Sequence, residues 1–268
     1  MNLKDSLLKT KDSLLKVKAS IVIFVILILA YFFLSNGSVF IPVEKIFSFA
    51  FSITHLENIF SFIIIHENLF HLAVNAIVFL GYAVLVELAI GTLDLAAIFV
   101  FSTIASALIF VFFNPNVSLI GSSIGVSALV ASSIILNPKK AIALTFVLGF
   151  GIFFIAPMIF SAIDAEKAQI QSEQISIENE LKNAVEQNDF ERQIVLAERK
   201  AVIEQKVSGF ESNIEFAEET PVNSQTHAMG AFFGMLYLLL FRRKKFNEGV
   251  RKILHLHFVD FDKHKIFK

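Results

Sequence analysis

Residues 116–140 read NVSLIGSSIGVSALVASSIILNPKK, and the expected fold is built around this stretch. It opens with a polar turn, runs apolar from Ile124 to Leu136, and stops at two lysines. As a helix, residues 123–136 span about 21 Å, whereas the hydrocarbon core of a bilayer is about 30 Å thick. With the lysines at one membrane surface, Ser123 lies inside the bilayer. Irregular backbone is tolerated at that depth only where it lines a protein-walled cavity.

The composition of the chain is that of an integral membrane protein. Of its 268 residues, 55% are hydrophobic and 31 are Phe, and the mean hydropathy is +0.68. There is no cysteine, which excludes disulfides, a thiol nucleophile and thiolate metal sites. We expect the lipid bilayer as surroundings, no metal or other cofactor, and no nucleic-acid partner.

The charges are segregated along the chain. Five Lys or Arg residues precede Ser20, two lie at 139–140, and nine follow Phe241. Residues 164–220 carry 14 acidic and six basic side chains. Because short basic flanks face the cytoplasm, we predict a multi-pass protein of the cell membrane with both termini cytoplasmic and an even number of spans.

The hydropathy pattern predicts an all-α membrane protein with six transmembrane helices. The expected spans are 20–34, 69–88, 95–113, 123–136, 141–160 and 227–241. We divide the chain into a basic amphipathic cytoplasmic segment (1–19), transmembrane helices 1–5 (20–161), an inserted hairpin (162–225), transmembrane helix 6 (226–241) and a basic cytoplasmic tail (242–268). Pro157 is expected to kink the fifth helix.

The inserted segment 162–225 is rich in Glu, Gln and Ala. Its apolar residues recur at three- and four-residue steps, which indicates helix, and the polar run 187–189 interrupts them. We predict an extracytoplasmic helical hairpin of coiled-coil type between helices 5 and 6. Two roles remain open for residues 164–220: a rigid spacer, or a surface that contacts substrates or a partner.

Four polar side chains share one depth in the predicted bundle. Counted from the cytoplasmic ends, Ser123 lies 16 residues before Lys139, and His227 lies 15 before Arg242. His71 lies at a similar depth, and Asn75 is one turn deeper on the same face. Polar groups inside membrane spans are functional candidates by default.

A serine and a histidine at matched depth predict a nucleophile, Ser123, and its general base, His227. We expect no Asp or Glu at that depth, so the pair is interpreted as a dyad. Asn75, His71 and the backbone N–H of Ser123 are candidates for stabilising an oxyanion.

Each residue also has a structural interpretation. Ser123 is one of several serines in its stretch, His227 could cap a helix, and His71 with Asn75 could form interhelical hydrogen bonds. Their shared depth favours the catalytic interpretation. The stretch Gly121-x-Ser123-x-Gly125 is not a nucleophile elbow, because that motif requires a preceding strand.

Three motifs together resemble the rhomboid intramembrane serine proteases. They are His66-x4-His71-x3-Asn75, Gly121-x-Ser123 and His227-x2-Gly230-x3-Gly234. The resemblance covers about residues 20–161 and 225–241. It implies a six-helix core, a Ser123–His227 dyad and an oxyanion site with His71 and Asn75. It gives supporting roles to Gly121, His66, Gly230 and Gly234, and it implies cleavage of transmembrane segments of other membrane proteins.

The chain departs from this family pattern at several places. Ile124 stands where a glycine commonly follows the nucleophile, Ser127 replaces an aromatic residue, and the Trp-Arg pair of the first outer loop is absent. The rival function is a non-proteolytic rhomboid-like protein that binds membrane-protein clients, but such relatives usually lose the serine or histidine. A transporter is disfavoured because no internal repeat is found. The tail histidines 255, 257 and 264 are expected to be solvated.

Overall fold

The computed structural model describes residues 17–219 and 224–262, with side chains for 17–211 and 224–255. The expectations for residues 1–16 and His264 lie outside this range. The described chain is helical, with isolated β-bridges in its loops. Its elements are α2 (Lys18–Ser35), α3 (Val43–Phe49), η1 (Leu56–Ile59), η2 (Ser61–Ile64), α4 (Leu69–Ile90), α5 (Thr92–Phe113), α6 (Ser123–Leu136), α7 (Pro138–Glu186), α8 (Phe190–Glu219), α9 (Ser224–Phe241) and α10 (Arg243–Asp262).

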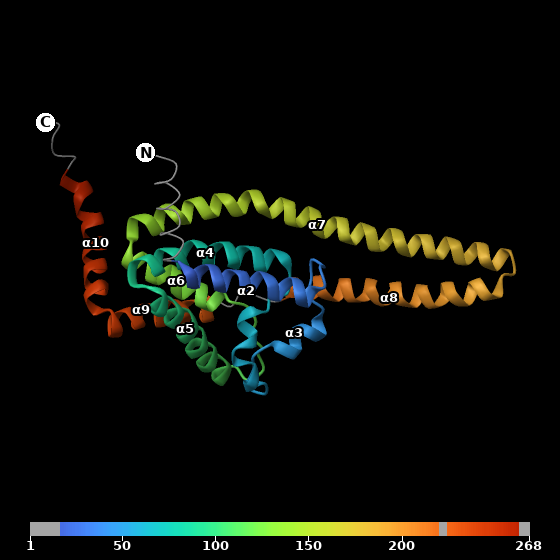
Figure 1. Cartoon of the computed structure of the whole chain (residues 1–268), viewed down its shortest axis with the longest axis horizontal. Helices are drawn as coiled ribbons and strands as arrows, with labels where there is room; N and C mark the ends of the chain where they lie inside the picture. Colours follow the sequence, from blue (N-terminus) through green and yellow to red (C-terminus); the bar gives the residue numbers. More distant parts are fainter. Residues whose placement is uncertain (1–16, 220–223, 263–268) are drawn as a thin grey trace.

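Helix α6 is the centre of the bundle. It has the bounds expected from the sequence, Ser123–Leu136, and it contacts α4, α5, α7, α9 and α10 (Figure 1). Small residues let its neighbours approach. A Cβ added at Gly125 would lie 2.4 Å from Thr103 Oγ1 and 2.6 Å from Phe99 Cδ2. A short helix surrounded on all sides can therefore hold its first residue at a fixed depth.

Three glycines bring α9 and α10 onto the backbone of α6. An added Cβ would lie 2.3 Å from Ile124 O at Gly230, 2.6 Å from Ala128 O at Gly234, and 1.9 Å from Ile135 O at Gly249. No side chain fits at these distances. Small residues spaced four apart are a common device for close helix packing in membranes.

Two buried carboxylates connect helices at the end of the bundle away from Ser123. Glu87 accepts hydrogen bonds from the Ala19 and Ser20 N–H groups and from the Ser20 hydroxyl, so it caps the start of α2. Asp94 accepts from Arg242 at 2.6 Å and 2.9 Å and from the Tyr237 hydroxyl at 2.9 Å. These contacts join α2 to α4 and α5 to α9.

The segment between α2 and α4 is folded against the chain before α6. Phe51 and Leu119 exchange two backbone hydrogen bonds of 2.9 and 2.7 Å. Gly121 N–H donates to Phe62 O at 2.8 Å. Phe51 and Phe62 are fully buried and stack with their ring centroids 5.3 Å apart. The loop thus fixes the chain that leads into Ser123.

The fifth span and the first arm of the hairpin form one continuous helix of 49 residues, α7. It runs through the expected boundary at residue 162 without a break, because residues 161–172 contain neither Gly nor Pro. Pro157 lies inside the helix and does not end it. Many Phe side chains on the first half of α7 are exposed, at positions 146, 150, 153, 154 and 160.

Helix α8 returns antiparallel to α7, and the pair projects beyond the bundle (Figure 1). The break lies at residues 187–189, where Asn188 has a φ of +56°. Buried residues recur every seven positions: Ile177 and Ala184 on α7, and Leu196, Ile203 and Phe210 on α8. The extracytoplasmic location and the coiled-coil type of this hairpin remain predictions.

Among the described residues, α2, α4, α5 and α7 are long and apolar enough to cross a membrane. Helix α6 is apolar but has only 14 residues, and α9 begins with the polar residues 224–227. The chain is a multi-pass membrane protein, and the count of six spans remains a prediction.

Candidate active site

Ser123 and His227 meet although they are 104 residues apart in the chain. The Ser123 hydroxyl and His227 Nε2 form a hydrogen bond of 2.9 Å. Ser123 is the first residue of α6, and His227 lies in the first turn of α9. Both side chains are partly buried. The bond exists because Gly230, one turn after His227, lets α9 contact the α6 backbone at Ile124.

Gly121 shapes the turn that delivers Ser123 to this position. Its φ is +94°, a conformation that side chains rarely adopt. A Cβ at Gly121 would also lie 3.1 Å from His71 Cε1. The glycine is therefore required twice, for the backbone turn and for the close approach of the His71 ring.

His71 and Asn75 lie on successive turns of α4 beside this turn. The Asn68 side chain caps α4 by accepting from His71 N–H at 2.8 Å. The Asn75 amide is buried and donates to the His71 carbonyl at 3.0 Å. One of its two N–H groups is thereby used within its own helix. An amide has a second N–H, which is the group available for an oxyanion.

His66 supports the turn rather than the Ser123–His227 pair. It is fully buried, and its Nε2 lies 3.1 Å from the Ser122 hydroxyl and 3.4 Å from Ser122 N–H. Its ring packs edge-on against His71, with centroids 5.0 Å apart. His66 Nδ1 has no hydrogen-bond partner in the described part of the chain.

Glu67 corrects the expectation that no acidic side chain lies near this depth. Its carboxylate forms a short hydrogen bond with His71 Nδ1 and is largely buried. The depth of a residue was counted along the helices, whereas Glu67 lies in the non-helical chain before α4. The four-residue spacing from Glu67 to His71 could have identified the pair. The carboxylate contacts His71 and not His227, and no acidic side chain of residues 17–211 or 224–255 is hydrogen-bonded to the Ser123–His227 pair.

Two residues that depart from the family pattern have defined places. Ile124 is buried, and its Cγ2 would lie 3.0 Å from a Cβ at Gly230, so its side chain packs against α9. The Ser127 hydroxyl donates to the Ser123 carbonyl at 2.9 Å, within the first turn of α6. Neither side chain displaces a member of the Ser123–His227 pair.

A family model described as "Rhomboid domain" matches residues 54–178. The match includes His66, His71, Asn75 and Ser123, and it ends before α9 and His227. No curated protein and no solved structure matches the chain.

Proposed function

We propose that this chain, whose residues 54–178 match the rhomboid-domain model, is an intramembrane serine endopeptidase of the rhomboid family. Members of this family are typically proteases, although some are inactive. The observation that carries the proposal is the 2.9 Å hydrogen bond between Ser123 and His227 Nε2. A hydroxyl is a poor nucleophile until a neighbouring base removes its proton, and His227 is positioned to do so.

In the proposed reaction, Ser123 Oγ attacks the carbonyl carbon of the scissile peptide bond while His227 Nε2 takes its proton. The negative charge moves to the carbonyl oxygen. His227 then donates the proton to the leaving amine, which leaves an acyl ester on Ser123. A water molecule, deprotonated by His227, hydrolyses the ester and restores the hydroxyl.

The oxyanion would be stabilised by donors at the start of α6 and on α4. The first N–H groups of a helix lack partners inside the helix, so Ser123 N–H is one donor. His71 and the second N–H of Asn75 are the other candidates. The Glu67 carboxylate holds His71 from the opposite ring nitrogen, which fixes the ring orientation.

The substrates of this proposal are transmembrane segments of other membrane proteins. The site lies at the start of a helix of 14 residues, about 21 Å from its end by helix geometry. A peptide bond must therefore reach Ser123 within the thickness of the membrane, where a substrate helix has to unwind locally. The proposed topology places both termini in the cytoplasm and the α7–α8 hairpin on the other side.

The test is cleavage of transmembrane reporter proteins by the purified chain reconstituted in liposomes. We expect wild type to produce two fragments and Ser123→Ala to produce none. A non-proteolytic, client-binding relative would bind reporters without cleaving them. Full cleavage by a folded Ser123→Ala variant would end the assignment of the nucleophile.

A further inference from the structure

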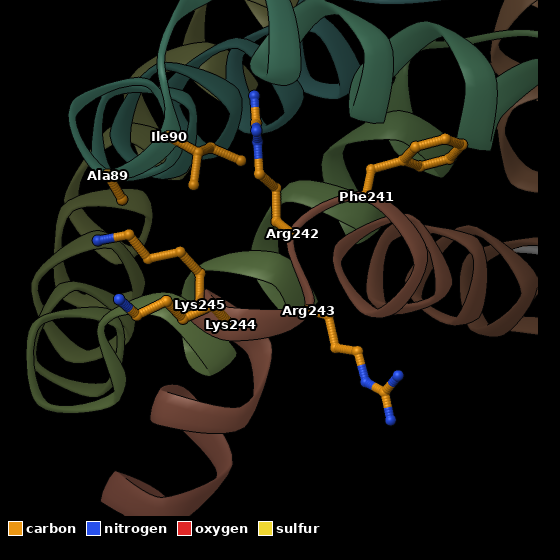
Figure 2. Close-up of a pocket in the computed structure, with 7 residues that line it drawn as sticks. All are labelled: Ala89, Ile90, Phe241, Arg242, Arg243, Lys244 and Lys245. Atoms are coloured by element: carbon orange, nitrogen blue, oxygen red, sulfur yellow. The ribbon is translucent and has the colours of Figure 1, made fainter.

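A basic cavity lies at the end of the bundle opposite His227. Its volume is about 490 Å³, and it is formed where α4, α9 and α10 meet (Figure 2). It is lined by Ala89, Ile90, Phe241, Arg242, Arg243, Lys244 and Lys245. We call it the basic pocket. By helix geometry, His227 and Phe241 are about 21 Å apart along α9, so the pocket is separate from the Ser123–His227 pair.

The cations of the pocket have different partners. Arg242 is engaged by Asp94, at 2.6 and 2.9 Å. Arg243, Lys244 and Lys245 are exposed, and none has an ion pair with another described residue. In Figure 2, Lys244 and Lys245 extend toward the side of Ala89 and Ile90, whereas Arg243 extends away from it. Two lysines that form no ion pair with a described residue therefore face an apolar wall.

These lysines sit in the first turn of α10, which contains no acidic residue. Positive charge is unfavourable there, because the helix dipole is positive at its start and the first N–H groups have no helical partners. An anion in the basic pocket would relieve both the charge repulsion and the unpaired donors.

Helix α10 crosses the end of α9 at a steep angle (Figure 1). Phe246, Val250 and Ile253 pack against the bundle core, at helical three- and four-residue steps, while Arg251 and Lys252 are exposed. An amphipathic helix attached to the end of a transmembrane bundle lies in the membrane interface. The basic pocket is thus at the depth of phospholipid headgroups.

We propose that the basic pocket binds the phosphate headgroup of an anionic phospholipid. The ammonium groups of Lys244 and Lys245 contact the phosphate, and Ala89, Ile90 and Phe241 contact the glycerol and the first methylenes of the acyl chains. A free phosphate ion would use the lysines alone. The apolar wall is the feature that selects a lipid. Basic residues next to the end of a membrane span attract anionic lipids, at roughly fivefold in affinity for each cation.

The experiment is native mass spectrometry of the full-length protein in detergent, titrated with phosphatidylglycerol or phosphatidylcholine. Wild type should retain one phosphatidylglycerol in preference to phosphatidylcholine. Lys244→Gln combined with Lys245→Gln should weaken that retention about 25-fold, and each single variant should weaken it about fivefold. The thermal midpoint should not change, because both side chains are exposed.

The matched control is Arg251→Gln combined with Lys252→Gln, which removes the same charge from the same helix outside the pocket. This control should retain phosphatidylglycerol as wild type does. Equal losses in the two double variants, or equal retention of both lipids by wild type, would overturn the proposal. Release of the lipid by excess inorganic phosphate would identify a free-anion site and would overturn it as well.

Discussion

Ser122 and Ser123 are adjacent hydroxyls with different histidine partners. Ser122 bonds to His66, which precedes α4, and Ser123 bonds to His227 on α9. Successive residues of a helix are rotated by about 100°, so neighbouring side chains at the start of α6 face different elements. Ser122 is therefore a matched control for the proposed nucleophile, Ser123.

We expect Ser123→Ala and His227→Ala each to abolish cleavage, and the double variant to be no worse than either, because the two groups act as a unit. Ser122→Ala should retain activity within about tenfold, since it loses one neutral hydrogen bond. Rates on a fluorogenic transmembrane reporter give the comparison. An inactive Ser122→Ala beside an active Ser123→Ala would reverse the two roles.

Glu67 is a positioning residue for His71 in this proposal. Removing its carboxylate in Glu67→Ala should lower kcat about 10- to 100-fold, because the short hydrogen bond to His71 Nδ1 is lost. Glu67→Gln should retain more activity, since its amide oxygen can still accept that bond. The control is Glu57→Gln, which removes an exposed carboxylate beside His55. Equal kcat in Glu67→Ala and wild type would show that His71 needs no support.

At the scale of elements, the approach of α9 to α6 decides the geometry of the pair. Gly230→Ala places a Cβ 2.3 Å from Ile124 O, so the helices must separate. We expect a loss of roughly 1–3 kcal/mol in stability and a larger loss of cleavage, at least about 100-fold. Gly151→Ala on α7 is the control, because nothing lies within 4 Å of its added Cβ. Wild-type cleavage by Gly230→Ala would mean that close packing there is dispensable.

The base of the α7–α8 hairpin is docked on residues 38–40, in the loop between α2 and α3. Glu166 accepts from the Ser38 hydroxyl at 2.7 Å and from Val39 N–H at 3.0 Å. Phe210 packs edge-on against Phe40, with centroids 5.4 Å apart. Val39 O in turn accepts from Leu69 N–H at 2.9 Å. The hairpin is thus linked, through residues 38–40, to the start of α4, the helix that carries His71.

This docking divides the hairpin into two testable parts. Glu166→Gln combined with Phe210→Ala should loosen the hairpin base, raise amide exchange at residues 38–40, and change the rate on membrane substrates. Glu180→Gln is the control, since Glu180 forms exposed contacts with Arg192 and Ser176 within the hairpin, which contribute little to stability. Unchanged exchange and unchanged rates in the docking variant would leave the contacts without functional effect.

The distal part of the hairpin is tested separately. Replacing residues 174–205 by a short Gly/Ser turn should preserve the docked base, because Glu173 and Lys206 face each other across the two arms, with Lys206 Nζ 3.9 Å from Glu173 Oε2. If the distal arms contact substrates or a partner, the order of preference across a panel of membrane substrates should change. Identical preferences would make the distal arms a rigid spacer.

At the scale of the whole molecule, the orientation in the membrane is testable because the native chain has no cysteine. Ser172→Cys, at an exposed position on α7, should react with an impermeant maleimide added to intact cells. Lys252→Cys on α10 should react only after the cells are permeabilised. The reverse pattern would invert the proposed topology and place the hairpin in the cytoplasm.

The features that depend on local composition could be predicted from the sequence. Hydropathy and the basic flanks defined the apolar helices, and the bounds of α6 follow from a polar glycine turn at one end and Asn-Pro-Lys-Lys at the other. The match in depth between Ser123 and His227 was also accessible, because a helix advances by a constant 1.5 Å per residue.

The contacts between side chains of different elements could not be predicted from the sequence and are seen in the folded chain. Glu67 pairs with His71, but it lies outside the helices, so its depth could not be found by counting helical residues. Glu166 and Phe210 contact a loop that lies some 130 and 170 residues earlier in the chain. Gly249 packs α10, expected as a tail, directly onto α6. Such contacts depend on which helices of similar hydropathy pack against one another. In a bilayer, helix pairing is determined by close packing and hydrogen bonding rather than by hydrophobicity. Neither the packing nor the hydrogen bonding can be predicted from a local pattern of residues.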